Sequence, residues 1–495
     1  MSRARRGLAA LLVGIALAVA PGAAQAAGNL QTGIANDGLL LAGDSTVAPL
    51  ARRLAAMGID SVRLHARWIA VVPRPVDRRR PRGFDMADPD DPLYNWAALD
   101  LAVDSLRANG IEPILAVTGS GPVWASRRPA LDDPRYKPDP RLFGQFAGAV
   151  AERYGPRVDR YLIWNEPNIP GWLRPQQRCS AGRCVLESPH LYRELFRFGA
   201  RAIRHRDRAA QVMIGTLAPR GTRAHSDDSR VRPLAFIRAM GCVTAKYRRD
   251  RKGRCRTARP VRADAFAYHP HPILRAPDER APNRDDAAIA DLGRLEAVLD
   301  STTRAGIVKP VSGRVFDIHL TEFGYQTNPP DAHVGVSPAR QARWIQQATY
   351  IAWKDPRIKT ITQYELQDEP TKTNGAGTDR FSGWQSGMIF ADGRAKPLLA
   401  AFPNPFWVDV RRGRTRARFW GQVRPGGAHA IALQRRIQGR WTTLRRLATS
   451  SFGYWSTVLP VRTPGVFRFT YELPRPGGSG TLLRTSLSQR VEPGR

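Results

Sequence analysis

Short apolar runs alternate with longer amphipathic stretches along most of this chain. The stretch 48–57 has the periodicity of a helix, ends before Gly58 and is followed by the strand-like run 59–64. The stretch 96–109 ends before Gly110 in the same way. A glycine directly after a helix supplies the left-handed residue that closes it, so these boundaries have a physical cause. The pattern predicts repeated units of one strand and one helix.

The units continue to about residue 402, and a third helix ends before Gly155, where we expect the same left-handed closure. The predicted strands are 30–36, 59–64, 111–117, 158–165, 211–217, 263–268, 315–322 and 358–366. The predicted helices are 48–57, 96–109, 142–154, 189–206, 285–305, 338–353 and 396–402. Eight such strands predict an α/β fold, a (β/α)8 TIM barrel over 27–403. The alternative, an open doubly wound sheet, would need a glycine-rich phosphate turn after its first strand, and Asn36-Asp37-Gly38 is no such motif.

The pattern changes after Pro405 to short alternating strands with turn residues between them. The predicted strands are 419–423, 428–433, 441–446, 455–459 and 465–471. They predict a small C-terminal all-β sandwich over 404–474. The tail 475–495 is rich in Pro, Gly, Ser and Arg, and we expect it to be disordered.

The first 26 residues have the composition of a secretory signal peptide. Arginines come first, an apolar run covers 8–20, and Ala24-Gln25-Ala26 follows as a small-residue cleavage site. A membrane anchor is the alternative, but the apolar run is short for a bilayer span. We therefore expect cleavage after Ala26 and a secreted, extracellular protein without a membrane span.

Four cysteines fit an oxidising compartment. We predict disulfides between Cys179 and Cys184 and between Cys242 and Cys255, although two other pairings are open. A metal site is the competing interpretation, but the spacings match no common zinc pattern.

The formal charge is +34, and arginine provides almost all of it. Nucleic-acid binding is the first class to consider. The arginines are scattered, however, and no common nucleic-acid-binding motif is present, so we expect no such partner. General amino-acid bias, with some attraction to acidic glycans or anionic cell surfaces, explains the charge better. The arginine-rich C-terminal sandwich could attach the protein to acidic surface glycans or serve only as structural support.

Two glutamates lie where predicted strands end. Glu166 follows the apolar run 161–164 within Trp164-Asn165-Glu166-Pro167-Asn168, and Glu322 lies in Thr321-Glu322-Phe323-Gly324. An unpaired buried carboxylate is costly, so each glutamate must face a cavity, a partner or solvent. In a barrel, the carboxyl ends of the strands build the active site. Glu166 and Glu322 would end the fourth and seventh strands.

These two motifs resemble those of the large clan of (β/α)8 retaining glycosidases, whose members include cellulases and β-xylosidases. The resemblance covers about three quarters of the chain. It implies a secreted glycoside hydrolase that cleaves O-glycosidic bonds in a β-linked polysaccharide or oligosaccharide. Glu166 would be the acid/base and Glu322 the nucleophile. Retention requires such a pair, about 5 to 5.5 Å apart, and passes through a covalent glycosyl-enzyme.

Further residues are candidates for binding the substrate or holding the nucleophile. Arg63 and Tyr268, which resemble clan residues, would direct a guanidinium and a hydroxyl towards Glu322; their alternatives are a structural ion pair and a core aromatic. Asn165 could hydrogen-bond a sugar 2-hydroxyl, or only cap the surface. His269 is expected to hydrogen-bond carbohydrate. No metal or cofactor is expected, because the prolines of His269-Pro270-His271-Pro272 fix an extended turn without a regularly spaced carboxylate or cysteine.

Aromatic rings bind the apolar faces of sugars, and Trp68, Trp124, Trp172 and Trp384 fall in predicted loops after strands, although each could equally be core. Clan members commonly place a tryptophan at the end of strand eight. Here that strand reads Thr362-Gln363-Tyr364-Glu365-Leu366, so Tyr364 or Trp384 would substitute, and Glu365 is expected to be structural or to bind substrate. The rival function is a non-catalytic glycan-binding or cell-surface protein on the same barrel.

Overall fold

A computed structural model describes residues 27–374, 377–410, 415–475 and 479–493. The predicted signal peptide, 1–26, lies outside these residues.

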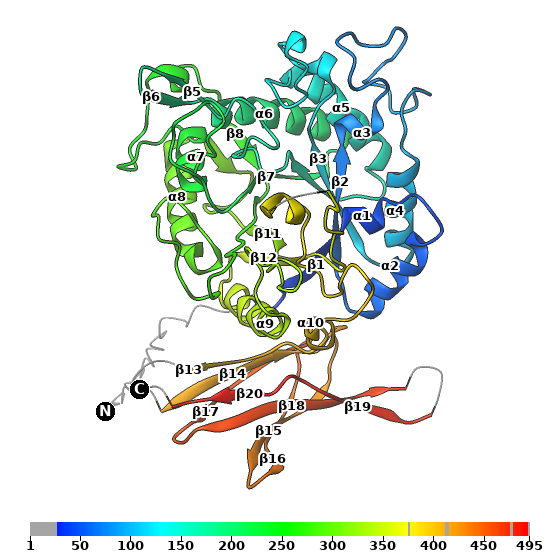
Figure 1. Cartoon of the computed structure of the whole chain (residues 1–495), viewed down its shortest axis with the longest axis vertical. Coiled ribbons are helices and arrows are strands. Elements are labelled where there is room, and N and C mark those ends of the chain that lie inside the picture. The colour runs from blue at the N-terminus through cyan, green and yellow to red at the C-terminus, as the bar shows by residue number, and fades with distance from the viewer. Residues whose placement is uncertain (1–26, 375–376, 411–414, 476–478, 494–495) are drawn as a thin grey trace, which may run out of the picture.

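Eight parallel strands close into a barrel in the order β1, β12, β11, β9, β7, β4, β3, β2 (Figure 1). Their bounds are β1 Gln31–Ala35, β2 Ser61–Arg67, β3 Glu112–Thr118, β4 Arg160–Ile163, β7 Gln211–Leu217, β9 Phe266–Tyr268, β11 Ile318–Phe323 and β12 Ile358–Tyr364. Each overlaps one of the predicted strands. The first and last strands pair in register, with Gly33 opposite Thr362, and this pairing completes the ring. The prediction of a (β/α)8 barrel is confirmed.

Helices surround the barrel and cover its apolar outer face. The longer ones are α2 Val47–Ala56, α4 Ala97–Ala108, α5 Pro140–Tyr154, α6 Ser188–Arg206, α7 Pro233–Met240, α8 Leu292–Ala305 and α9 Pro338–Lys354, and the shorter ones are α1 Asp37–Leu40, α3 Trp68–Val71 and α10 Pro397–Ala401. Gly58 and Gly110 have φ of 74° and 71°, as the closure argument requires. Gly155 does not, because its φ of −47° continues the right-handed turn of α5. The left-handed closure predicted at Gly155 is therefore wrong.

Some elements lie in segments that the sequence pattern did not resolve. Helix α7 lies within the long connection between β7 and β9. A hairpin of β5 Gln177–Ser180 and β6 Arg183–Leu186 follows β4, and the short strands β8 Val261–Ala263 and β10 Val308–Pro310 pair with each other. These elements lengthen the loops of the barrel without adding to its ring.

The C-terminal region is a sandwich of two antiparallel sheets. One sheet contains β13 Phe406–Val410, β14 Arg416–Gln422 and β17 Tyr454–Pro460. The other contains β15 Ala430–Ile437, β16 Arg440–Ala448, β18 Gly465–Pro474, β19 Thr481–Thr485 and β20 Gln489–Val491. Side chains from both sheets, including Phe419 and Phe469, form one core. The predicted disorder of 475–495 is wrong where β19 and β20 pair with β18, because a strand beside a formed sheet gains hydrogen bonds whatever its own composition.

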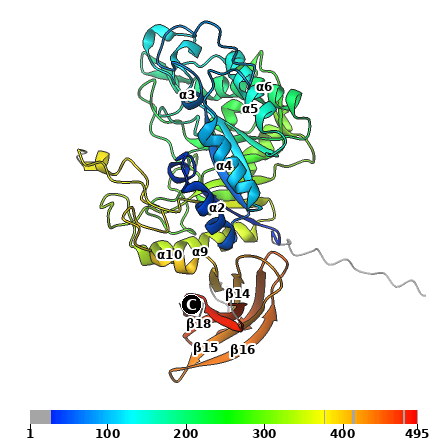
Figure 2. The ribbon, with the colours of Figure 1, turned by 90° about the vertical axis from the view of Figure 1, so that its right-hand side faces the viewer.

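The sandwich packs against the flank of the barrel at α9 and α10 (Figures 1 and 2). Trp420 and Tyr454 of the sandwich belong to the hydrophobic core of the barrel. The Tyr454 hydroxyl donates to the carbonyl of Leu30, 2.8 Å away, just before β1. This contact leaves the carboxyl ends of the barrel strands uncovered by the sandwich.

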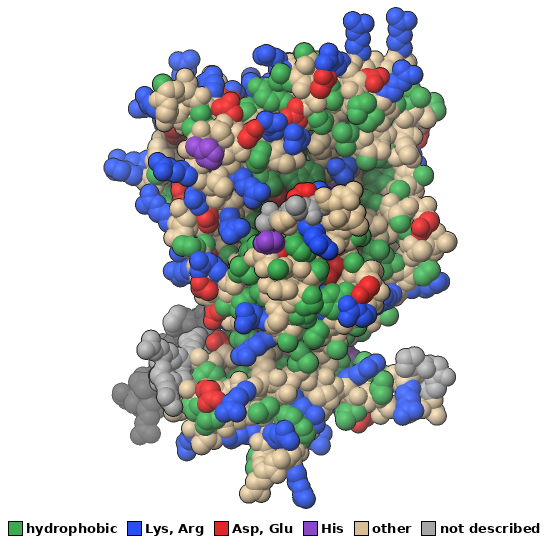
Figure 3. Space-filling view, viewed as in Figure 1, with side chains coloured by type: hydrophobic (Ala, Val, Ile, Leu, Met, Phe, Trp, Pro, Cys, Tyr) green, Lys and Arg blue, Asp and Glu red, His purple; other side chains and the backbone are tan. Residues whose placement is uncertain are grey.

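Both predicted disulfides are present. Cys179 pairs with Cys184 across the β5–β6 hairpin, and Cys242 pairs with Cys255 beyond α7. Within the described residues, no helix combines the length and apolar character that a membrane crossing requires. Basic side chains are spread over the whole face in Figure 3 rather than gathered into one patch.

Candidate active site

Glu166 lies in an irregular turn directly after β4. Trp164 and Glu166 have φ of 71° and 36°, a region that side chains other than glycine rarely adopt and that often marks functional sites. The backbone N–H of Glu166 donates to the carbonyl of Thr216, 2.9 Å away, which holds the turn against β7. The Trp164 ring is fully buried against Gly119, where an added Cβ would lie 2.3 Å from Cζ2 of that ring. The packing of Trp164 thus turns Glu166 out of the strand.

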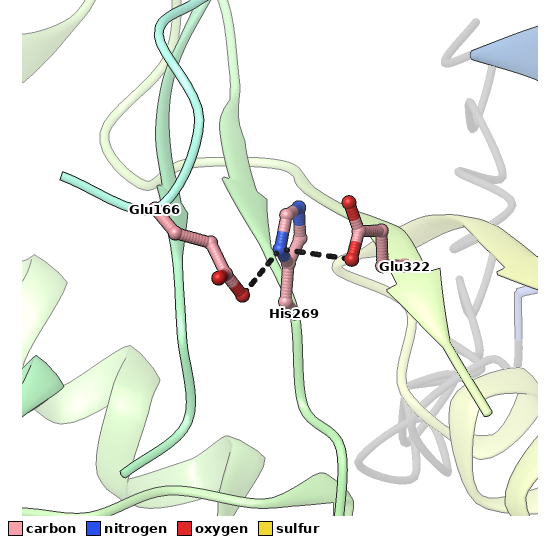
Figure 4. Close-up of side chains that lie close together, drawn as sticks. All are labelled: Glu166, His269 and Glu322. Carbon is pink, nitrogen blue, oxygen red and sulfur yellow. Dashed lines mark hydrogen bonds and ion pairs between the residues drawn. The ribbon is translucent and has the colours of Figure 1, made fainter. Parts of the chain in front are cut away.

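His269 lies between Glu166 and Glu322 (Figure 4). It follows β9, and its Nδ1 is 3.2 Å from Oε1 of Glu166 and 3.5 Å from Oε2 of Glu322. The three ligand-type atoms of these side chains lie within 4.8 Å of one another. The ends of β4 and β11, far apart in the sequence, therefore bring the two predicted carboxyls together on one imidazole.

Glu322 is buried among cationic and hydrogen-bonding groups. Arg63, on β2, donates through Nη2 to Oε1 of Glu322 at 2.9 Å, and Nε2 of His271 is 3.5 Å from the other oxygen. Burial raises the pKa of Glu322, but His269, Arg63 and His271 together lower that pKa well below its usual range. Glu322 is therefore ionised at neutral pH.

Arg63 is itself held by a second row of residues. Its Nη1 contacts Nε2 of His65, and Nδ1 of His65 is 2.5 Å from a carboxylate oxygen of Asp37, in α1. The chain from Asp37 through His65 fixes the direction of the guanidinium. Neither Asp37 nor His65 was assigned this role from sequence, although His65 and Arg63 lie two residues apart on one strand and so face the same side.

Asn165 and His269 carry polar atoms that the described residues leave without a hydrogen bond. Asn165 is 3% exposed, and its Oδ1 has no hydrogen-bond partner among the described residues. His269 is fully buried, and its Nε2 has no partner there either. Unpaired buried polar atoms are costly unless a ligand satisfies them. Both atoms belong to residues at strand ends beside the carboxyl pair.

Three aromatic candidates lie in the packed core, which is the alternative that the sequence left open for each of them. The Tyr268 hydroxyl donates to the carbonyl of Ala287, 2.8 Å away, so it is directed away from Glu322. Trp68 and Trp124 are buried in the hydrophobic core: Trp68 stacks on Phe146, and Trp124 packs edge-on against Phe84. Their rings are therefore not available to a sugar.

The other aromatic candidates remain near the carboxyl pair. Trp384 packs against His271 with ring centroids 4.9 Å apart and against Tyr364 at 5.5 Å. Trp172, in the loop after β4, lies 5.6 Å from the ring of His65. All three rings are partly exposed or adjoin residues that contact Glu322. Tyr364, the last residue of β12, and Trp384 thus contact each other beside His271.

Glu365 is a further carboxyl near Glu322, with a different protonation state. It is 1% exposed, and its Oε2 has no partner among the described residues. Burial, followed by the charges of Glu369 and Glu322, raises the pKa of Glu365 to about 10. Glu365 is thus a neutral carboxylic acid at neutral pH.

Glu166, His269 and Glu322 are spaced so that they could hold a metal ion. The guanidinium of Arg63 already pairs with Glu322 and places a positive charge beside this position. That charge repels a cation, so the donor set fits a proton-transfer pair better than a metal centre.

No protein-family model and no curated protein matches the chain. Solved structures similar to it include a family 39 glycoside hydrolase from the gut symbiont Bacteroides cellulosilyticus WH2, with 13% identity over 88% of this chain and 82% of that one and a TM-score of 0.47. A glucosidase from Croceicoccus marinus has 12% identity over 89% and 94% of the two chains and a TM-score of 0.47. A family 1 β-glucosidase from Thermotoga maritima has 12% identity over 73% and 92% and a TM-score of 0.44.

Proposed function

We propose that the protein is a secreted retaining glycoside hydrolase that acts on a β-linked glycan or glycoside. The observation that carries this proposal is the carboxyl pair at the ends of β4 and β11, whose nearest oxygens lie within 4.8 Å of each other. Retaining glycosidases hold their carboxyls about 5 to 5.5 Å apart, and inverting enzymes about 6.5 to 9.5 Å, to leave room for a water. The short separation supports retention.

The two carboxyls would act in two steps. Glu166 protonates the leaving oxygen while the ionised Glu322 attacks the anomeric carbon, and the glycosidic bond breaks as the glycosyl-enzyme ester forms. Glu166 then removes a proton from water, which attacks the same carbon and releases Glu322. His269 contacts both carboxyls and would hold their separation, and Asn165 would hydrogen-bond the sugar 2-hydroxyl.

Two substitutions test these roles on a panel of aryl β-glycosides and polysaccharides. Glu322→Gln removes the nucleophile and should abolish turnover. Glu166→Ala should slow substrates whose leaving group needs protonation far more than activated aryl glycosides. Glu152→Gln, an exposed glutamate on α5, is the matched control and should leave both unchanged. Equal losses on both kinds of leaving group in Glu166→Ala would contradict the assignment.

A non-catalytic glycan-binding protein remains the second candidate. Binding a glycan does not require an ionised carboxylate next to a second carboxyl. The presence of this pair therefore favours an enzyme. A panel of 2-fluoro glycosides should label Glu322 covalently, and glycan binding without any labelling would favour the second candidate. Attachment to acidic surface glycans through the sandwich stays a prediction.

A further inference from the structure

A cavity of about 770 Å³ adjoins the carboxyl pair. Its walls come from the loops after β7 and β9 and from the segment before α8. His271 belongs to both places, because it lines the cavity and its Nε2 is 3.5 Å from Oε2 of Glu322. A glycan unit in the cavity would therefore be a near neighbour of the unit held at the carboxyls.

The lining of this cavity has an excess of positive charge. Four arginines line it, Arg220, Arg230, Arg232 and Arg275, together with the single carboxylate of Asp286. Asp286 is 2.5 Å from Nη1 of Arg232, and Arg275 pairs with Glu279, which is not part of the lining. Arg220 and Arg230 have no ion pair or hydrogen bond from their side chains within the described residues. Two guanidinium groups without an ion pair among the described residues therefore line the cavity.

The charges lie close enough to act on one another. Burial lowers the pKa of Arg220, Asp286 opposes this, and the charges of Arg230 and Arg275 lower the pKa further. An anion between these guanidiniums would relieve their repulsion.

The general abundance of arginine is the alternative explanation, and a second cavity provides a comparison. A cavity of about 440 Å³ beside α8 is also lined by arginines. There Arg238 pairs with Asp285 at 2.9 Å, and Arg294 pairs with Asp291 at 3.2 Å. Arg280 and Arg284 also line that cavity, without an ion pair or side-chain hydrogen bond among the described residues. Unpaired arginines thus line both cavities. The cavity next to His271 differs in having one carboxylate in its lining where the second cavity has two, and in adjoining Glu322 through His271.

We propose that this cavity is a subsite for an anionic glycan unit, so that the substrate carries a carboxylate or sulfate group next to the bond that is cleaved. Guanidinium groups bind both anions through charge-assisted, often bidentate hydrogen bonds. The inference rests on the proposed function, because it assigns a substrate class to the same site.

Binding measurements separate this inference from the proposed catalysis. The probes are cello-oligosaccharides of one length in three forms: neutral, oxidised at C6 to carboxylate, and sulfated. Calorimetry with the mature chain should give tighter binding of one anionic form than of the neutral form, and the form that binds tells whether carboxylate or sulfate is recognised. Arg220→Ala with Arg230→Ala should weaken that binding about tenfold or more, the scale of a lost charged hydrogen bond.

The matched control is Arg223→Ala with Arg251→Ala, which removes the same charge from two exposed positions outside the cavity. It should change the affinity less than about twofold, since only long-range attraction is lost. Equal weakening by both double variants, or no preference for either anionic form, would overturn the proposal. Labelling of Glu322 by 2-fluoro glycosides is independent of these results, so a failure of the subsite and a failure of the glycosidase assignment are distinguishable.

Discussion

Arg63 places a buried cation beside Glu322, the proposed nucleophile, and its charge is one reason that Glu322 is ionised. Removing the charge with Arg63→Met should raise the pKa of Glu322, so the low-pH limb of kcat/KM should move to higher pH. Losing one partner of a buried ion pair should also cost about 3 to 5 kcal/mol of unfolding free energy. A pH profile on an activated aryl glycoside measures the shift.

Arg63→Lys keeps the charge and is the control for this experiment. The low-pH limb of its kcat/KM profile should stay closer to that of the parent protein. The loss of the planar guanidinium with its paired N–H donors can still lower kcat. An acid limb that is identical in Arg63→Met and the parent protein would show that the limb does not report Glu322.

Glu365 provides a prediction about stability rather than activity. Its folded pKa of about 10 is above its ordinary value of 4.5, so between those values the native state binds more protons than the unfolded state. The contribution of Glu365 to the free energy of unfolding is therefore fully present below the lower pKa. It decreases as pH rises, by at most about 1.4 kcal/mol per pH unit. Glu365→Gln cannot ionise and should gain stability relative to the parent as pH rises.

Denaturant unfolding of both proteins at about pH 5 and about pH 9 measures this difference. The advantage of Glu365→Gln should be larger at the higher pH. Glu279→Gln, at an exposed position, should show no such trend. A constant difference between parent and Glu365→Gln at both pH values would mean that Glu365 ionises normally in the fold.

The sequence predicts the position of side chains that lie at a strand end. It does not predict the direction of side chains whose orientation depends on packing. Glu166 and Glu322 were found because carboxyls that follow apolar strands need a cavity. The direction of the Tyr268 side chain stayed open because a single strand does not reveal which of its faces meets the helices. His271 could have been found, since it lies two residues after His269 in an extended, proline-flanked segment and so shares its side.

At the scale of elements, the two disulfides close loops of different length and burial. Cys242 and Cys255 are 13 residues apart and both buried, whereas Cys179 and Cys184 are 5 residues apart in a partly exposed hairpin. Loop entropy assigns about 3 kcal/mol to the longer loop and about 2 kcal/mol to the shorter one. Replacing the pair 242 and 255 by alanine should therefore lower Tm more than replacing the pair 179 and 184, as calorimetry would measure. The reverse order would imply that the hairpin contributes more to stability than its exposure suggests.

The barrel strands were predictable because each is an apolar run next to a helix with a clear boundary. The hairpin of β5 and β6 was not, because its strands have four residues each and alternate in burial without a strong apolar face. Strands β19 and β20 have the same weakness and form only because β18 offers a free edge. Local pattern thus predicts elements that bury their own apolar face, and misses those that depend on a neighbour.

At the scale of the whole molecule, the barrel and the sandwich share one hydrophobic core rather than touching at a polar surface. Trp420 is fully buried between the two parts, with its ring 5.8 Å from Trp353 and 5.6 Å from Tyr350 of α9. Gly58 permits the close approach, because an added Cβ there would lie 2.7 Å from Cα of Pro425. A junction of this kind couples the stability of the two parts.

We therefore expect the protein to unfold in a single calorimetric transition. Trp420→Ala should lower the Tm of that transition, since removing a buried tryptophan costs about 3 to 5 kcal/mol. Trp441→Ala removes the same side chain from a half-exposed position on β16, where Arg468 lies over its ring, and should cost much less. Two separate transitions would contradict this expectation. If only one of them responded to Trp420→Ala, the sandwich would fold independently of the barrel.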